Sequence, residues 1–329
     1  MPLLIGLKKE CCEVFPIIVP NASFSLKTVN FYLVKQENSL SLIDAGWNNT
    51  ACWEALNTTL KKNGFKLSDL TEIILTHHHI DHIGLVNRIV SEHPIPVYTH
   101  PDSIPRLKRD KDFLEMRAEF YAKLYHQMGC GQVGEARVAY LRKAIVTKKD
   151  EAIEGDISAI RDNTLLNFQV INVPGHAPDQ LAFLDQRENR LFGGDLLIEH
   201  ISSNALVEPD SLGNRIPSLS QHIDSLTKLL ELDVNLVFSG HGEPIKNPSA
   251  LTLKRLERIE AKGDRLTQLI QSGITTASEI AFVNYKNIYY EQFDLVMSEI
   301  IGHLDYLESK RRIEKELVKG VWHYKVLQK

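Results

Sequence analysis

A run of four potential metal ligands within six residues constrains this chain more than any other part of its sequence. The run reads His77-x-His79-x-Asp81-His82 and directly follows a stretch, Glu72 to Thr76, that is typical of a buried β-strand. In a strand, residues two positions apart point to the same side, so His77 and His79 are expected to project together. The pattern turns helical from Asp81. The run therefore predicts a metal site where a strand meets a helix.

Three further potential ligands each stand beside glycine at the end of an expected strand. They occur in the segments Pro174-Gly175-His176, Gly193-Gly194-Asp195 and Gly240-His241-Gly242. Neighbouring glycines give the backbone freedom to aim such side chains inward. Five imidazoles and two carboxylates exceed the four ligands of one tetrahedral zinc ion. The set favours two ions, one held by three histidines and the other by two histidines and an aspartate, with one carboxylate between them and a bridging hydroxide as nucleophile.

This combination of ligands resembles that of the metallo-β-lactamase fold hydrolases, over roughly residues 15–245. The resemblance implies an α/β fold, a four-layer αβ/βα sandwich with the site at one edge of its two sheets. It also implies the role of each ligand. By the resemblance, the first metal is bound by His77, His79 and His176, the second by Asp81, His82 and His241, and Asp195 bridges the two.

The resemblance extends to one branch of the superfamily. Residues 193–204 and 239–245 resemble the branch that carries a C-terminal winged-helix-like module, which includes uncharacterised bacterial hydrolases and a group of endoribonucleases. Hydroxyacylglutathione hydrolases and acyl-homoserine lactonases share the same seven ligands. Activity on a β-lactam is not expected, because the paired Asp81-His82 and the bridging Asp195 resemble the thioesterase and lactonase side of the superfamily.

The chain is expected to divide into a catalytic domain, residues 1–245, and a helical, winged-helix-like domain, residues 246–329. The first contains a highly charged segment at about 101–160, whose apolar residues recur at helical spacing, which predicts a helical insertion. Elsewhere in the first domain the pattern predicts a strand over 28–35 and a helix over 51–62. The chain is expected to end in a hairpin turning at Lys319-Gly320.

Five residues outside the ligand set are candidates for supporting roles. Asp44 follows an apolar strand, where it could end the strand or orient a ligand imidazole. His200 and Asn204 follow Asp195 in the chain, on a loop that should border the cleft, and are candidate substrate contacts. Tyr121 and Tyr125 lie on one face of an expected helix, where ordinary packing competes with a lid that contacts a substrate carbonyl.

Two function hypotheses follow. The first is a dinuclear zinc-dependent hydrolase that cleaves an ester, thioester or lactone of a small-molecule acyl substrate, with Asp195 and Asp81 as catalytic carboxylates; Asp81 could also hold the proton of the nucleophile. Iron or manganese could replace zinc. The alternative is a metal-dependent ribonuclease acting on single-stranded RNA. A formal net charge of −4 and a single dense basic run, Lys310-Arg311-Arg312, disfavour a nucleic-acid partner.

The remaining sequence features concern location and assembly. The N-terminal residues lack the pattern of a signal peptide, and no apolar run approaches the ~18 residues of a membrane span. The cysteines at 11, 12, 52 and 130 show no metal-binding or redox spacing. These features predict reduced thiols in a cytoplasmic protein that does not associate with membranes. The C-terminal domain could mediate a homodimer.

Overall fold

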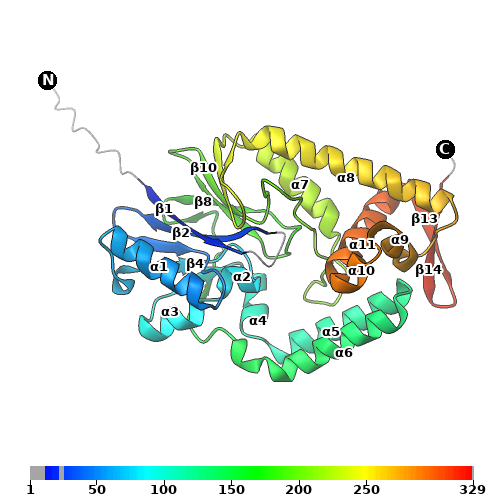
Figure 1. The fold of residues 1–329 in the computed structure, drawn as a ribbon, viewed down its shortest axis with the longest axis horizontal. Helices are drawn as coiled ribbons and strands as arrows, with labels where there is room; N and C mark the ends of the chain where they lie inside the picture. The colour runs from blue at the N-terminus through cyan, green and yellow to red at the C-terminus, as the bar shows by residue number, and fades with distance from the viewer. Residues whose placement is uncertain (1–11, 22–25, 328–329) are drawn as a thin grey trace.

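Two β-sheets form the centre of the structure, which is a computed structural model (Figure 1). It describes residues 12–21 and 26–327, so the expectations for the N-terminal segment and for Cys11 lie outside the described residues. The first sheet runs β1-β2-β3-β4-β5-β6 and the second β12-β11-β10-β9-β8-β7. The strands are β1 (Glu13–Pro20), β2 (Thr28–Lys35), β3 (Leu40–Ile43), β4 (Glu72–Ile74), β5 (Val97–Thr99), β6 (Ile157–Ala159), β7 (Thr164–Leu165), β8 (Phe168–Asn172), β9 (Leu181–Asp185), β10 (Arg190–Gly194), β11 (Leu236–Ser239) and β12 (Ile245–Lys246).

Helices cover the outer faces of the sheets and make up much of the rest of the described chain. They are α1 (Thr50–Lys62), α2 (Ile80–Ile83), α3 (Val86–Glu92), α4 (Ile104–Leu107), α5 (Lys111–Gln127), α6 (Gly131–Thr147), α7 (Ser218–Glu231), α8 (Pro248–Gln271), α9 (Ala277–Tyr285), α10 (Ile288–Glu291) and α11 (Phe293–Ser309). A two-stranded sheet, β13 (Ile313–Val318) and β14 (Val321–Val326), follows α11. Within residues 12–21 and 26–327, no helix combines the length and apolar character needed to cross a membrane.

Both faces of each sheet are buried, which produces four layers. Between the sheets, Phe183, Phe192 and Phe238 of the second sheet pack with Tyr32 and Ile74 of the first. The outer face of the first sheet packs on α1 and α3, and that of the second on α7 and α8. A sheet that is buried on both faces needs continuous apolar strands, and this explains why the interior of β2 is buried throughout. The order helix, sheet, sheet, helix confirms the four-layer αβ/βα sandwich.

The helical insertion is shorter than the expected range of about 101–160. Its helices α4, α5 and α6 are followed by a short 3₁₀ turn at Lys149–Glu151, and residues 157–159 form β6, which pairs in parallel with β5. A strand of three residues is too short to show the alternation of polar and apolar residues that marks a strand. Its place at the edge of the first sheet is therefore a result of tertiary packing.

The C-terminal part has the expected order of helices followed by a hairpin. Val318 pairs with Val321, so Lys319 and Gly320 form a two-residue turn, and both have positive φ (51° and 87°). This backbone geometry matches the type of turn that favours the right-handed twist of a hairpin. The turn therefore lies where the sequence predicts it. That the module acts as a winged helix stays a prediction.

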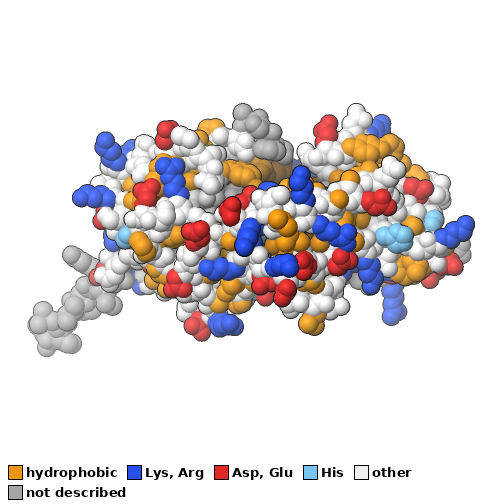
Figure 2. All heavy atoms as spheres, turned by 90° about the horizontal axis from the view of Figure 1, so that it is seen from below, with side chains coloured by type: hydrophobic (Ala, Val, Ile, Leu, Met, Phe, Trp, Pro, Cys, Tyr) orange, Lys and Arg blue, Asp and Glu red, His pale blue; other side chains and the backbone are white. Residues whose placement is uncertain are grey.

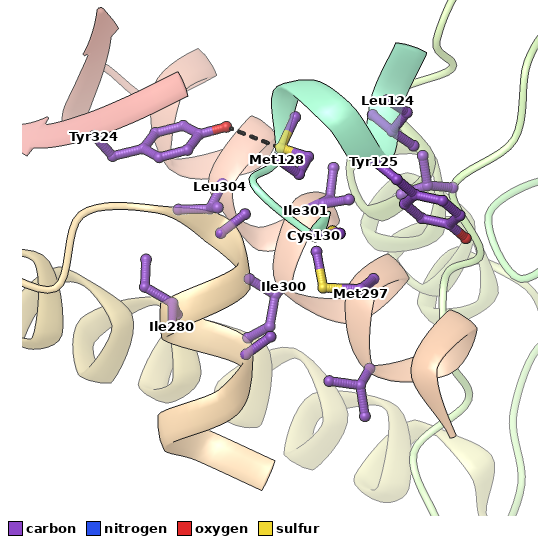
Figure 3. Close-up of a cluster of buried hydrophobic side chains, with 14 of the residues drawn as sticks. Leu124, Tyr125, Met128, Cys130, Ile280, Met297, Ile300, Ile301, Leu304 and Tyr324 are labelled. Carbon is purple, nitrogen blue, oxygen red and sulfur yellow. Dashed lines mark hydrogen bonds between the residues drawn. The ribbon is translucent and has the colours of Figure 1, made fainter. Parts of the chain in front are cut away.

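The insertion packs against the C-terminal helices, a contact that the sequence does not predict. A buried cluster joins Tyr125 and the adjoining Met128 with Met297 and Ile300 of α11 and Tyr324 of β14 (Figure 3). The Tyr324 hydroxyl lies 3.7 Å from the Met128 sulfur. Helices α5 and α6 run side by side along the bottom of Figure 1, from near α4 toward β14. The insertion thus links the catalytic sandwich to the C-terminal part.

Candidate metal centre

All seven predicted ligands lie where strands of the two sheets end. His77 and His79 follow β4, Asp81 and His82 belong to α2, and His176, Asp195 and His241 follow β8, β10 and β11. The structure brings their ligand atoms together in three overlapping groups, within each of which all ligand atoms lie within 4.8 Å of one another. These groups are His77, His79 and His176; Asp81, His82 and His241; and His77, His82 and Asp195.

The atoms of the first group are spaced as ligands of one ion would be. His79 Nδ1 lies 2.9 Å from His77 Nε2 and 3.0 Å from His176 Nε2. Asp195 Oδ2 lies 3.4 Å from His176 Nε2. A tetrahedral zinc ion with bonds of about 2.0–2.1 Å places its ligand atoms about 3.3 Å apart. Three imidazoles and one carboxylate oxygen at these separations therefore fit a four-coordinate ion.

The second group shares the carboxylate of Asp195 with the first. His241 Nε2 lies 3.3 Å from Asp195 Oδ2 and 3.4 Å from Asp81 Oδ2, and His82 Nε2 lies 3.4 Å from Asp195 Oδ1. Within the described residues, His82 Nε2, His241 Nε2 and Asp195 Oδ1 are buried without a hydrogen-bond partner. Buried polar atoms are rarely left unpaired. Their convergence fits a cation that all three would bind.

Asp44 orients the ligand His82, which is one of the two roles the sequence allows for it. The Nδ1–H of His82 donates to Asp44 Oδ2 over 2.7 Å, which leaves Nε2 free to bind a metal. The backbone N–H and the hydroxyl of Thr76 also donate to Asp44, each over 2.8 Å. Thr76 Oγ1 in turn lies 3.0 Å from Nδ1 of His77. One buried carboxylate thus positions ligands of both groups.

Backbone carbonyls orient two of the remaining imidazoles. Nδ1 of His241 donates to Thr28 O over 2.7 Å, and Nδ1 of His176 donates to Asn204 O over 2.9 Å. The amide of Asn30 donates to Ser239 O (3.1 Å) and Gly242 O (2.7 Å) and so fixes the loop that carries His241. In each case the hydrogen bond directs Nε2 of the imidazole toward the centre.

Burial and neighbouring charges set the protonation of the centre. Burial, together with the neighbouring imidazoles, holds the pKa of His77 and His79 well below the usual value, so these rings are neutral, as metal ligands must be. Burial also lowers the pKa of His82, but the carboxylates of Asp44 and Asp195 outweigh it and raise that pKa. The pKa of Asp195 is well below its usual range because nearby imidazoles outweigh its burial.

Space, in addition to backbone freedom, requires glycine beside the ligands. A Cβ atom on Gly240 would lie 2.4 Å from Asp195 Oδ1 and 2.5 Å from Cε1 of His82. At Gly194, where φ is +50°, a Cβ atom would lie 2.7 Å from the hydroxyl of Thr76. A side chain at either position would displace a ligand or the residue that supports it.

A cavity of about 1430 Å³ opens beside the centre. Asp81, His176 and Asp195 line it, together with side chains of the insertion and of the C-terminal helices. Asn204 also lines it, so its predicted contact with substrate stays a prediction, whereas His200 lies against Gly242 and is not among the lining residues.

The structure favours packing for Tyr121 and Tyr125, and their predicted contact with substrate stays a prediction that it does not support. Both rings are buried in the cluster between the insertion and the C-terminal helices, and neither lines the cavity. The Tyr121 hydroxyl donates to Val207 O over 2.8 Å, and the Tyr125 hydroxyl donates to Asp294 over 3.2 Å. Their helical spacing serves packing, the alternative that the sequence leaves open.

Sequence reasoning missed a buried network that joins the metal loop to the insertion. His78, which lies between two ligands, donates from Nδ1 to Asp179 over 2.7 Å. Ser103, directly before α4, also donates to Asp179. Burial would raise the pKa of Asp179, but the neighbouring His78 outweighs it, so this pKa lies below its usual value. An isolated aspartate in a loop carries no local pattern, so no sequence signal could have identified it.

The fold and the ligand set together define a metal-dependent hydrolase. The chain belongs to the metallo-beta-lactamase superfamily, whose family model matches residues 26–241. It is 32% identical over 304 residues to the probable metallo-hydrolase YqjP of Bacillus subtilis (strain 168), covering 92% of this chain and 94% of that protein. It is 23% identical over 248 residues to an atrochrysone carboxyl ACP thioesterase of Aspergillus fumigatus, covering 75% of this chain and 61% of the relative.

Solved structures show the same fold over nearly the whole chain. A metallo-beta-lactamase family protein from Thermus thermophilus superposes with a TM-score of 0.76 at 23% identity, covering 95% of this chain and 98% of that chain. A beta-lactamase domain protein from Burkholderia ambifaria gives a TM-score of 0.74 at 19% identity, covering 95% and 92%. The extent of these matches shows that the insertion and the C-terminal helices belong to an arrangement found in other proteins.

Proposed function

We propose that this hydrolase binds two divalent ions, zinc in the first instance, and cleaves an ester, thioester or lactone bond. The position of Asp195 is the observation that carries the proposal. Its carboxylate lies within 3.4 Å of ligand nitrogens from both groups of three residues, as a bridging ligand must. A mononuclear centre would need only four of the seven converging ligands.

The residues of the chain have distinct tasks in this reaction. When bound, the two ions supply a water of lowered pKa and an electrophile for the acyl oxygen. Asp81 lines the cavity and directs one oxygen, Oδ2, to within 3.4 Å of His241 Nε2, so its second oxygen can accept the proton of the attacking water. The water oxygen bonds to the acyl carbon, the bond to the leaving oxygen or sulfur breaks, and the leaving group takes up a proton.

Two observations support an acyl substrate and a zinc centre. The relative from Aspergillus fumigatus is named as a thioesterase. The ligands are imidazole and carboxylate, which zinc accepts at tetrahedral spacing. Iron and manganese accept the same ligand types, so the metal found in the purified protein decides this part of the proposal.

The ribonuclease alternative has weaker support. Phosphate binding needs unpaired cations, but Arg117 and Arg137, which line the cavity, are paired with Glu208 and Asp294. In the C-terminal basic run, Arg312 is paired with Asp264 at 2.7 Å. On the face that Figure 2 shows, basic and acidic side chains are intermingled. Binding of RNA, a homodimer and a cytoplasmic location stay predictions.

One panel of substrates tests the proposal. Protein loaded with zinc, and protein treated with chelator, are assayed on an acyl-glutathione thioester, a homoserine lactone, an aryl ester and single-stranded RNA. We expect turnover of one or more acyl substrates that chelator abolishes and added metal restores. Cleavage of RNA alone would contradict the proposal and favour the ribonuclease.

A pair of matched variants tests the bridging role. Asp195→Asn should reduce bound metal from two ions to about one and lower turnover at least a hundredfold, because an amide is a poor bridge between two cations. Asp185→Asn is the control: Asp185 is also buried, but it pairs with Arg190 at 2.8 Å, at the opposite end of β10. Two retained ions in the Asp195→Asn protein would overturn the dinuclear assignment.

A further inference from the structure

The cavity beside the metal centre is larger than a small polar substrate requires. Its volume of about 1430 Å³ exceeds the range of about 300–1,000 Å³ that is usual for small-molecule sites. Its walls include the loops of the metal centre and α7 of the sandwich, helices α4, α5 and α6 of the insertion, and helices α8 to α11 of the C-terminal part. A substrate in this space can extend well beyond the bond that is cleaved.

Large apolar side chains that face solvent gather around this cavity. Five of them line it, and their exposure lies between 43% and 61%: Ile80 of α2, Tyr140 of α6, Ile288 and Tyr290 of α10, and Leu295 of α11. Hydrophobic side chains are also prominent at the upper right of Figure 2, over the C-terminal helices. Exposed apolar surface marks places where a protein partner, a membrane or a ligand binds, and around a concavity it fits a ligand-binding groove.

This apolar wall begins directly at the metal centre. Ile80 lies between the ligands His79 and Asp81 in the chain. Asn204, in the loop that follows β10, connects the centre to α11. Its side-chain amide donates to Leu295 O over 2.7 Å, and its backbone O accepts the Nδ1–H of His176. One residue therefore separates a metal ligand from the start of α11.

Several charged side chains of the wall neutralise one another. Arg137 forms an ion pair with Asp294, and its guanidinium lies 4.7 Å from the centre of the Tyr140 ring. Lys262 forms an ion pair with Glu299. These pairs offset part of the charge of the wall, and most of the wall surface that an incoming ligand meets is apolar.

We propose that this cavity is the acyl site of the enzyme and that it binds a medium-length or long hydrocarbon acyl chain between α6 and α10–α11. The inference deepens the proposed function and rests on it: the acyl carbon lies at the metal centre and its chain extends along Tyr140 and Leu295. Hydrolysis adds water across the acyl bond and releases a carboxylic acid within the apolar walls and an alcohol or thiol outside them.

A chain-length series tests the acyl site. Zinc-loaded protein is assayed on straight-chain p-nitrophenyl esters from two to twelve carbons. We expect kcat/KM to rise about fourfold for each added methylene until the cavity is filled, which is the fold-change for burying one CH₂. A series in which kcat/KM does not rise with chain length would overturn the inference.

Variants of the wall give the matched comparison. Tyr140→Ser and Leu295→Ser should lower the ratio of kcat/KM for the decanoyl ester to that for the butanoyl ester at least tenfold. Val146→Ser is the control, because Val146 belongs to the same helix as Tyr140, is 77% exposed and is not among the lining residues. Both wall residues are half-exposed, so unfolding midpoints near that of the wild type are expected. An unchanged ratio, or an equal fall in the control, contradicts the acyl site.

A binding experiment that needs no turnover separates this inference from the proposed function. Decanoate is titrated calorimetrically into metal-free Asp195→Asn protein, with and without Leu295→Ser. We expect binding with a negative heat-capacity change that Leu295→Ser weakens at least tenfold. Decanoate binding without turnover of any acyl compound supports the site and overturns the function, whereas turnover without decanoate binding overturns the site alone. If the wall variants instead dissociate a dimer, the surface is an interface between two copies, and the inference is wrong.

Discussion

Replacement of Asp44 by asparagine is the most direct test of how the metal centre is built. Asp44 has φ of +59°, a left-handed conformation that asparagine also adopts readily, so the backbone should be retained. The carboxylate accepts three hydrogen bonds, from the N–H and hydroxyl of Thr76 and from Nδ1 of His82. Asparagine keeps one acceptor oxygen and presents an N–H group to the other donors.

The size of the effect follows from the contact with His82. An amide N–H facing Nδ1–H of His82 forces the ring to turn or to move its proton to Nε2, the atom that faces the metal centre. Loss of a hydrogen bond to a charged group costs about 1.5–3 kcal/mol. Loss of a residue that orients a ligand typically lowers metal affinity about 10–100-fold, which agrees with that energy. We expect the weaker of the two ions to lose affinity by this factor.

Competition with a chromophoric chelator measures the affinity of each ion. Asp185→Asn is again the control. It removes a buried carboxylate that pairs with Arg190 at the start of β10, whereas the candidate ligand Asp195 follows the end of that strand. The thermal unfolding midpoint of each metal-free variant reports whether the fold is retained. Affinities of both ions within twofold of wild type, or an equal loss in the control, would refute the reasoning.

Four further predictions follow from the contacts described above. Gly240→Ala should weaken metal binding at least tenfold in the same titration, because its Cβ atom would lie 2.4 Å from Asp195 Oδ1. Leu304→Ala, in the fully buried cluster that joins the insertion to the C-terminal helices, should lower the free energy of unfolding in urea by about 2–5 kcal/mol. Burial would raise the pKa of Glu208, but Arg117 outweighs it and lowers this pKa to about 2. Above the unfolded-state pKa of about 4.5, the wild type should therefore be more stable than Glu208→Gln by at most about 3 kcal/mol. This difference should disappear as pH falls toward 2, as measured by urea unfolding across that range. Removal of metal should lower stability by about 2.7 kcal/mol for each ion present at a hundred times its dissociation constant, as measured by unfolding with and without chelator.

Local patterns were enough to predict several strands and helices of the sandwich. The strand expected over residues 28–35 is β2, and the helix expected over 51–62 is α1 with one more residue at its start. The strand expected to reach Thr76 ends at Ile74. The N–H of Leu75 still donates to Tyr98 O over 2.9 Å, whereas the N–H of Thr76 donates to the side chain of Asp44. At Thr76 the backbone N–H thus bonds the carboxylate that orients His82.

The seven candidate ligands could be predicted from sequence because their signal is local. Five of them closely follow a strand, Asp81 and His82 lie in the short helix α2 that comes directly after His79, and glycine adjoins three of the seven. Among the residues that support them, Asp44 also follows a strand, but Asp179 carries no such signal, and neither partner could be named from sequence. Asp44 reaches His82 across 38 positions, and His78 reaches Asp179 across 101. Such pairs depend on how strands and loops are brought together in space, which no short segment encodes.

The sequence by itself determined several strands and helices and the set of candidate ligands, because periodicity and residue chemistry act over a few positions. The four-layer fold was implied by the resemblance of the ligand set to the metallo-β-lactamase fold hydrolases, and the order of the strands within each sheet came only from the structure. Only the tertiary structure decided that the insertion packs on the C-terminal helices. That contact buries Tyr121 and Tyr125, which the sequence offered as substrate contacts, and leaves Tyr140 and Leu295 around the cavity. The physical reason is that one helical face looks the same in sequence whether a core or a ligand will cover it.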